Sequence, residues 1–94
     1  MPSETVARFL AFHSAPNLTK ETFTEALREV RNWRPDPRTT VIKVYYSSED
    51  GKLISECEAA RREDFEAWLS SRGWAWDNIY KVSLIAQTGN IWEL

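Results

Sequence analysis

The chain has 94 residues with 12 basic and 14 acidic side chains, which gives a formal net charge of −2. This length predicts a single domain over residues 1–94, and the negative charge argues against nucleic-acid binding. No apolar run approaches the roughly 20 residues of a membrane span. Cys57 is the only cysteine, so no intramolecular disulfide can form. We therefore expect a cytoplasmic protein without nucleic-acid or membrane partners.

The first third of the chain predicts a strand and then a helix. Both faces of the strand at residues 6–13 are largely apolar, one with Val6, Leu10 and Phe12 and the other with Ala7, Phe9, Ala11 and His13. Thr19 is a suitable N-cap, because its hydroxyl oxygen accepts a hydrogen bond from a free backbone N–H. The helix is expected to run to about Asn32, with an inner stripe of Phe23, Ala26, Leu27 and Val30.

A β-hairpin is predicted for residues 39–58, after a stiff connector at residues 33–38 that contains two prolines. Its first strand, residues 39–46, is rich in β-branched and aromatic side chains. Strict alternation would place Thr40, Ile42, Val44 and Tyr46 on one face of this strand. The dipeptide Asp50-Gly51 is a strong turn signal, and residues 52–58 return as the second strand.

The last third predicts a second helix and a final strand. The helix at residues 59–72 has an inner stripe of Phe65, Trp68 and Leu69 but no good N-cap, and Gly73 is expected to close it in a left-handed conformation. An aromatic connector at residues 74–78 leads to a strand at residues 79–87. A turn at residues 88–90 and a short terminal strand at residues 91–94 complete the chain.

The predicted order of elements is β-α-β-β-α-β. This order is that of an α+β, ferredoxin-like fold, in which an antiparallel four-stranded sheet carries two helices on one face. The other face has apolar residues and no element of this chain left to cover it. We therefore expect a homodimer, in which two sheets pack face to face as a dimeric α/β barrel.

Four short motifs point to a family. Leu18-Thr19 precedes the first helix, Ser48-Glu49-Asp50-Gly51 forms the hairpin turn, Glu58-Ala59-Ala60 opens the second helix, and Gly73 is followed by residues 77–82. In this arrangement the chain resembles a family of small ferredoxin-like proteins of unknown function that includes nickel-responsive proteins, within the dimeric α/β-barrel superfamily. The resemblance implies the same dimeric fold and makes a divalent transition metal, nickel, the candidate cofactor.

The chain departs from that family at its metal-binding positions. Where relatives have a histidine after the helix-ending glycine, this chain has Trp74, and the place of their cysteine is taken by Ser55, with Cys57 two residues later. A histidine-rich metal site is therefore not carried over. The remaining candidate metal ligands are His13, Cys57, Glu56 and Glu58, which show no metal-ligand spacing motif. Each also has a simpler interpretation, as a hydrogen-bonded histidine, a small core residue or solvent-exposed charges.

Aromatic residues are numerous and suggest a pocket. The candidate lining residues are His13, Tyr45, Trp68, Trp74, Trp76 and Tyr80. Aromatic side chains with a few polar groups are typical of small-molecule sites, although the same rings could complete the core and a dimer interface.

Three functions are consistent with the sequence. The first is a non-catalytic protein that binds a small ligand or a metal. The second, by analogy of fold, is a cofactor-independent enzyme, monooxygenase-like or cyclase-like, that acts on an aromatic or polyketide-like molecule with His13 as the proton carrier. The third is a structural module that binds a protein partner through Trp92 and the terminal segment. Whether the chain is an enzyme stays open at this point.

Overall fold

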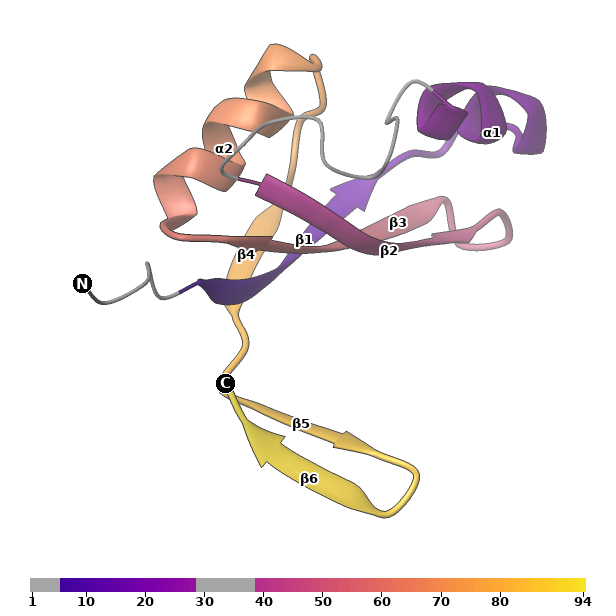
Figure 1. The fold of residues 1–94 in the computed structure, drawn as a ribbon. Helices are drawn as coiled ribbons and strands as arrows, with labels where there is room; N and C mark the ends of the chain where they lie inside the picture. Colours follow the sequence, from indigo (N-terminus) through magenta and orange to yellow (C-terminus); the bar gives the residue numbers. More distant parts are fainter. Residues whose placement is uncertain (1–5, 29–38) are drawn as a thin grey trace.

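The computed structural model describes residues 6–28 and 39–94 of the chain. Its elements follow in the order β1 (Ala7–Ser14), α1 (Lys20–Arg28), β2 (Thr39–Ser47), β3 (Lys52–Ala59), α2 (Arg62–Ser71), β4 (Asn78–Lys81), β5 (Leu84–Gln87) and β6 (Asn90–Glu93). Strands β1 to β4 form an antiparallel sheet in the order β2-β3-β1-β4, and among the described strands β5 pairs only with β6. Both described helices lie on one side of the larger sheet, and the β5–β6 hairpin lies on the other (Figure 1). The predicted α+β class is confirmed, and the arrangement is compatible with a ferredoxin-like fold.

The main core lies between the larger sheet and α2. Its buried apolar residues are Phe9, Ala11, Val41, Cys57, Ala59, Phe65, Trp68, Leu69 and Ile79. The odd-numbered residues of β1 and β3 face α2, as alternation along a strand requires. The predicted inner stripe of α2 is confirmed, because Phe65, Trp68 and Leu69 are all buried there.

The predicted pattern of β2 is wrong beyond its third residue. The pairing with β3 shifts between Val41 and Lys43, which pair with the adjacent residues Cys57 and Glu56. Ile42 is therefore an extra residue, as in a β-bulge, and the strand changes its phase there. As a result Val41 and Val44 both face the helices, whereas strict alternation would have separated them.

The predicted single strand at residues 79–87 is also wrong. The pairing of β4 with β1 ends at Lys81, and the last bond between them is donated by the Val82 N–H to the Arg8 carbonyl at 2.8 Å. Strand β1 begins at Ala7, and among the described residues the chain pairs no further with it and leaves the sheet. It then forms the separate β5–β6 hairpin, whose two turn residues, Thr88 and Gly89, both have positive φ angles. The short terminal strand is confirmed as β6.

The start of α1 agrees with the sequence prediction. The Thr22 N–H donates to Thr19 Oγ1 at 3.1 Å, and the Thr19 N–H donates to Thr22 Oγ1 at 2.9 Å, so the two threonines cap the helix reciprocally. The predicted continuation to Asn32 and the connector at residues 33–38 lie outside the described residues. As described, neither α1 nor α2 is long and apolar enough to cross a lipid bilayer.

Candidate functional site

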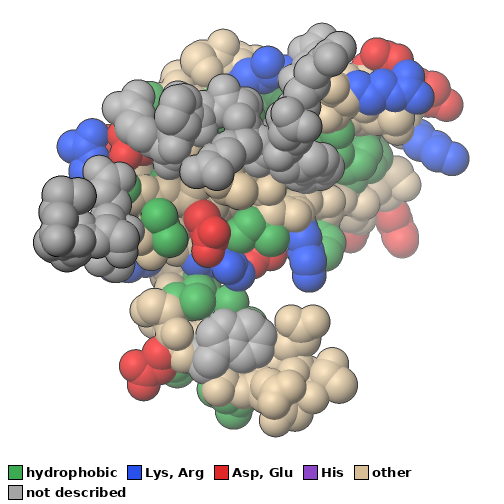
Figure 2. Space-filling view, in the orientation of Figure 1, with side chains coloured by type: hydrophobic (Ala, Val, Ile, Leu, Met, Phe, Trp, Pro, Cys, Tyr) green, Lys and Arg blue, Asp and Glu red, His purple; other side chains and the backbone are tan. Residues whose placement is uncertain are grey.

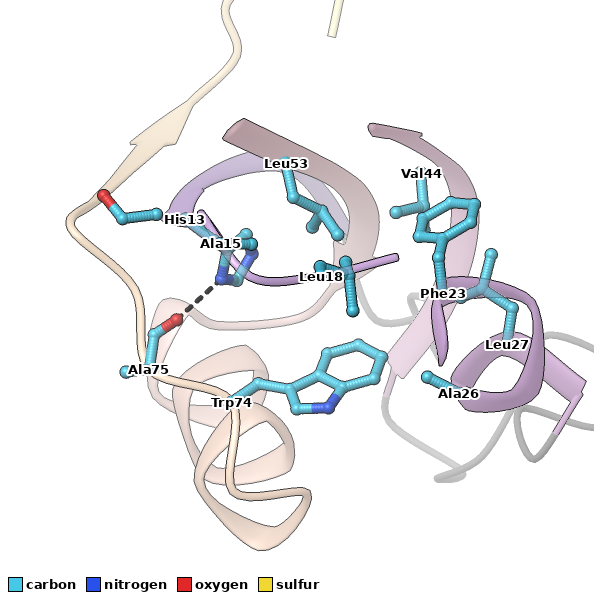
Figure 3. A pocket seen from close by; sticks show the side chains of 11 residues that line it. His13, Ala15, Leu18, Phe23, Ala26, Leu27, Val44, Leu53, Trp74 and Ala75 are labelled. Carbon is cyan, nitrogen blue, oxygen red and sulfur yellow. Dashed lines mark hydrogen bonds between the residues drawn. The ribbon is translucent and has the colours of Figure 1, made fainter. Parts of the chain in front are cut away.

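A cavity of about 210 Å³ lies on the helix side of the sheet, between α1 and the end of β1 (Figure 3). Among the described residues, its lining consists of His13, Ser14, Ala15, Leu18, Phe23, Ala26, Leu27, Val44, Leu53, Trp74 and Ala75. Most of these side chains are apolar. The cavity is therefore a site for an apolar group, with one imidazole at its edge.

The helix α1 covers this cavity on the side away from the sheet. Its apolar stripe of Phe23, Ala26 and Leu27 faces the cavity, but none of the described residues of α1 is fully buried. Phe23 stacks on Tyr46 of β2 with ring centroids 5.3 Å apart, and the Tyr46 hydroxyl donates a hydrogen bond to the Leu18 carbonyl. These contacts hold the start of α1 above β2, while the space beneath the rest of the stripe stays open.

Trp74 forms one wall of the cavity because of how α2 ends. Gly73 has a φ of +73°, which glycine adopts without steric cost. The Gly73 N–H donates to the Ser70 carbonyl at 3.0 Å and the Trp74 N–H donates to the Leu69 carbonyl at 2.9 Å. This pair of bonds is a Schellman motif and confirms the predicted role of Gly73. The turn directs the chain back over the sheet and brings the indole of Trp74 to the cavity.

His13 is buried, with 5% of its surface exposed, and both of its ring nitrogens have partners. Nδ1 lies 2.7 Å from the Ala75 carbonyl oxygen, and Nε2 lies 2.9 Å from Ser55 Oγ. A carbonyl oxygen only accepts, so Nδ1 carries the hydrogen and, in the neutral ring, Nε2 accepts from the Ser55 hydroxyl. The ring therefore ties the segment after α2 to β1 and β3.

The structure brings two of the six predicted pocket residues, His13 and Trp74, to the cavity. Trp68 is buried in the core and packs edge-on against Trp74, with ring centroids 5.5 Å apart. Trp76 is half-buried and packs against the same core. Tyr45 and Tyr80 belong to the opposite face of the sheet, because their neighbours in the strands face the helices. Their side chains are 51% and 55% exposed.

The four predicted metal ligands do not converge. His13 and Cys57 face the helices, whereas Glu56 lies on the other side of the sheet, where Arg8 binds it at 2.9 Å and binds Glu58 at 3.0 Å. Within residues 6–28 and 39–94, no three His, Cys, Asp or Glu side chains are grouped so that they could hold a metal ion. Among the described residues, these four donors therefore form no cluster that could hold a metal ion.

Cys57 is fully buried in the core, which affects its reactivity. Burial raises the pKa of the Cys57 thiol to about 12, and the Glu56 carboxylate adds to the rise. A thiolate is the form that attacks electrophiles or binds metals, so the environment keeps this cysteine in its inert form.

The sequence analysis did not predict most of the apolar lining of the cavity. The lining residues that it did not include are mainly Leu18, Phe23, Leu27, Val44 and Leu53. The sequence does carry a signal for the part that α1 contributes, because Phe23, Ala26 and Leu27 belong to the predicted inner stripe of this helix. In this stripe Phe23 stacks on Tyr46 of β2, and the cavity lies between the stripe and the sheet.

Comparison of the chain with models of protein families, with curated proteins and with solved structures finds no match. The function is therefore argued from the geometry of the site.

Proposed function

We propose that the chain is a non-catalytic protein that binds a small apolar or aromatic molecule in the cavity beneath α1. The observation that carries this proposal is the cavity itself, which is lined almost entirely by apolar side chains and closed at one edge by the buried imidazole of His13. Apolar cavities with few polar groups favour ligands that lose little hydration on binding.

The volume of the cavity limits the size of the ligand. An apolar cavity of about 150 Å³ holds a benzene molecule, whereas drug-sized ligands occupy pockets of roughly 300–1,000 Å³. At about 210 Å³ the cavity suits a molecule of one or two fused rings, or a short aliphatic chain. Such a ligand has about ten heavy atoms and, at about 0.5 kcal/mol per atom, would bind with a sub-millimolar Kd.

His13 and Trp74 shape the site in this proposal. The bond from His13 to the Ala75 carbonyl fixes the segment that carries Trp74, so the indole is held as a rigid wall. A preorganised wall lowers the ordering cost of binding. His13 is therefore a positioning residue, and its polar atoms are already satisfied without a ligand.

The hydrogen bonds of His13 also bear on the two other roles considered for it, as a proton carrier and as a metal ligand. A metal ligand needs a free ring nitrogen, and His13 would have to give up Ser55 or Ala75 to provide one. As a proton carrier His13 would act through Ser55, whose side chain is buried away from any substrate. The nickel-binding function implied by the family resemblance would also need donors that the described part of the chain does not group together. A ferredoxin-like domain in the cytoplasm, with a reduced and buried Cys57, is the setting that we propose for this binding function.

A fluorinated probe tests the proposal directly. We suggest titrating 5-fluoroindole, whose bicyclic ring matches the cavity, and following its ¹⁹F NMR signal. The test variant is Ala26→Phe, which places a ring in the cavity from the inner stripe of α1. The matched control is Ala67→Phe, which adds the same ring at an exposed alanine of α2.

The expected result is saturable binding to the wild type and to Ala67→Phe, with a loss of at least tenfold in affinity in Ala26→Phe. Equal binding to all three proteins, or no binding to the wild type, would overturn the proposal. A circular dichroism spectrum and a melting curve for each variant show that the ring has not unfolded the domain.

A further inference from the structure

A second group of polar side chains lies at the end of the larger sheet. Ser14 is the last residue of β1 and pairs with Lys52, the first residue of β3. The Ser14 hydroxyl donates a hydrogen bond to the Asp77 carboxylate at 2.7 Å, and the Lys52 ammonium donates to Ser14 Oγ at 3.4 Å. We call these three residues the polar border. It places a cation and an anion around one hydroxyl group.

An apolar floor adjoins the polar border on the side of the sheet opposite the helices. Phe12 lies two residues before Ser14 and pairs with Ile54 of β3 and with Asn78 of β4. Phe12 and Ile54 belong to that side because the odd-numbered residues of β1 and β3 face α2. Tyr80 packs edge-on against Phe12, with ring centroids 5.5 Å apart, and is more than half exposed. The floor therefore offers aromatic and aliphatic surface to a bound molecule.

An open depression of about 370 Å³ joins the polar border to the apolar floor. This volume is within the roughly 300–1,000 Å³ of small-molecule sites. Its described lining includes the polar residues Lys52, Asp77 and Asn78 and the apolar residues Phe12, Ile54 and Tyr80. No described residue of the β5–β6 hairpin lines it, and Figure 2 shows this hairpin as a lobe separate from the body. A small molecule in the depression would contact charged and apolar groups together.

Backbone hydrogen bonds hold the polar border in place. The Asp77 N–H donates to the Phe12 carbonyl at 2.7 Å, which fixes residue 77 beside the end of β1. Lys52 follows the turn between β2 and β3, where the Gly51 carbonyl accepts from the Ala15 N–H at 2.8 Å. Groups that are fixed before binding lose less conformational freedom when a ligand arrives. The polar border is therefore preorganised on both sides of Ser14.

The two charges of the border are not paired with each other. Within the described residues, neither Lys52 nor Asp77 forms an ion pair with another side chain. Their contacts with Ser14 keep the ammonium within about 6 Å of the carboxylate. An ammonium has three N–H donors and a carboxylate has two acceptor oxygens, so both groups keep hydrogen-bonding capacity for a ligand.

A free α-amino acid carries the complementary pair of charges. Its amino nitrogen and its carboxyl carbon are about 2.5 Å apart, because both are bonded to the same Cα. With hydrogen bonds of about 2.8 Å at each end, these groups can contact a cation and an anion about 6 Å apart. A phosphate or a simple carboxylate would attract Lys52 but repel Asp77, and a simple amine would do the reverse. A border with no net charge therefore favours a zwitterion.

We propose that the depression binds a free α-amino acid with a large apolar or aromatic side chain. Lys52 contacts the carboxylate, Asp77 contacts the ammonium, and the ligand's side chain lies on Phe12 and Tyr80. An aromatic ring gains offset or edge-on contacts with these two rings. Because the site is open and the ligand has only about a dozen heavy atoms, the expected Kd is about 1 mM. This site is separate from the cavity beneath α1 and does not depend on its ligand.

A ¹⁹F NMR titration of the full chain with 4-fluoro-L-phenylalanine tests the proposal. Two analogues separate the charges, since 3-(4-fluorophenyl)propanoate lacks the ammonium and 2-(4-fluorophenyl)ethylamine lacks the carboxylate. The test variants Lys52→Met and Asp77→Asn each remove one charge of the border. The matched controls are Lys20→Met and Glu63→Gln, at exposed positions of α1 and α2 outside the depression.

We expect the wild type and both controls to bind the amino acid at least about threefold more tightly than either analogue. Lys52→Met should weaken binding of the amino acid and the propanoate by about threefold or more, but not binding of the amine. Asp77→Asn should weaken binding of the amino acid and the amine, but not binding of the propanoate. Equal affinity for the three ligands would overturn the proposal, as would test variants that bind like the wild type. So would a wild type that binds no amino acid up to about 10 mM.

Competition with indole distinguishes this site from the cavity beneath α1. We expect excess indole to leave the affinity for the amino acid unchanged, because the two ligands occupy opposite sides of the sheet. Displacement of the amino acid by indole would place it in the cavity beneath α1 and would overturn the amino-acid site alone. Binding of the amino acid, with the expected variant effects but without any binding of indole, would instead contradict only the proposed function.

Discussion

The imidazole Nδ1 of His13 lies 2.7 Å from the carbonyl oxygen of Ala75 and ties β1 to the segment that follows α2. The two residues are far apart in sequence, and this segment carries Trp74, a wall of the cavity. The bond therefore links the stability of the fold to the shape of the site.

Replacing His13 should lower the stability of the fold and disturb the shape of the cavity. His13→Ala removes the donor to Ala75 and the partner of Ser55, and leaves the buried polar groups unsatisfied, at a cost of about 1–3 kcal/mol in the free energy of unfolding. His13→Asn keeps one short N–H donor and should lose less. Urea unfolding followed by tryptophan fluorescence measures the difference. Equal stability of wild type and His13→Ala would show that the bond does not order this segment.

Gly73→Ala should destabilise the end of α2. The φ of +73° costs an L-residue about 1 kcal/mol, and no neighbouring atom would clash with the added methyl group. For a domain of this size, the expected fall in melting temperature is about 4–8 °C. Gly73→Asn, which tolerates the left-handed region better, is the matched control and should fall less. A melting temperature unchanged in Gly73→Ala would contradict the role assigned to this turn.

The raised pKa of the Cys57 thiol should make the free energy of unfolding depend on pH in the alkaline range. Burial raises the pKa of its thiol from 9.0 to about 12, with a further contribution from Glu56. Between these values the unfolded chain releases the thiol proton and the folded chain retains it, so stability falls as pH rises. The contribution is fully present below about pH 9, and above it the unfolding equilibrium constant increases up to about tenfold per pH unit.

The variant Cys57→Ala has no thiol proton to release, so comparison with it isolates the contribution of Cys57 to the pH dependence of stability. We expect the stability of the wild type to fall more steeply than that of Cys57→Ala between about pH 9 and about pH 11 in urea titrations. Parallel profiles for the two proteins would mean that the thiol titrates normally. Below pH 9, a thiol reagent should react with Cys57 only at the rate of unfolding.

Local patterns in the sequence predicted much of the fold. Alternation along β1 placed Phe9, Ala11 and His13 on one face, and the helical stripe of Phe65, Trp68 and Leu69 marked the buried side of α2. These predictions succeeded because each rests on the geometry of a single element. The same is true of Gly73, whose conformation follows from where the helix ends.

The errors came from features that depend on a partner strand. The bulge at Ile42 is visible only in the pairing of β2 with β3, and the break after Lys81 is visible only in the pairing of β4 with β1. The residues of the candidate site could not be predicted from single elements either. Large aromatic residues suggested a pocket, but Trp68 fills the core, and strand phase sends Tyr45 and Tyr80 to the other face. The cavity depends instead on the distance between α1 and the sheet, which no local pattern specifies.

The position of a bound ligand is the most direct test of the account. An isotope-filtered NOE spectrum of labelled protein with unlabelled indole reports which methyl groups lie near the ring. The account predicts contacts with Leu27, Val44 and Leu53, which line the cavity beneath α1. Contacts with Leu84 and Ile85 instead would place the ligand in the hollow between the larger sheet and the β5–β6 hairpin, and would contradict the proposed site.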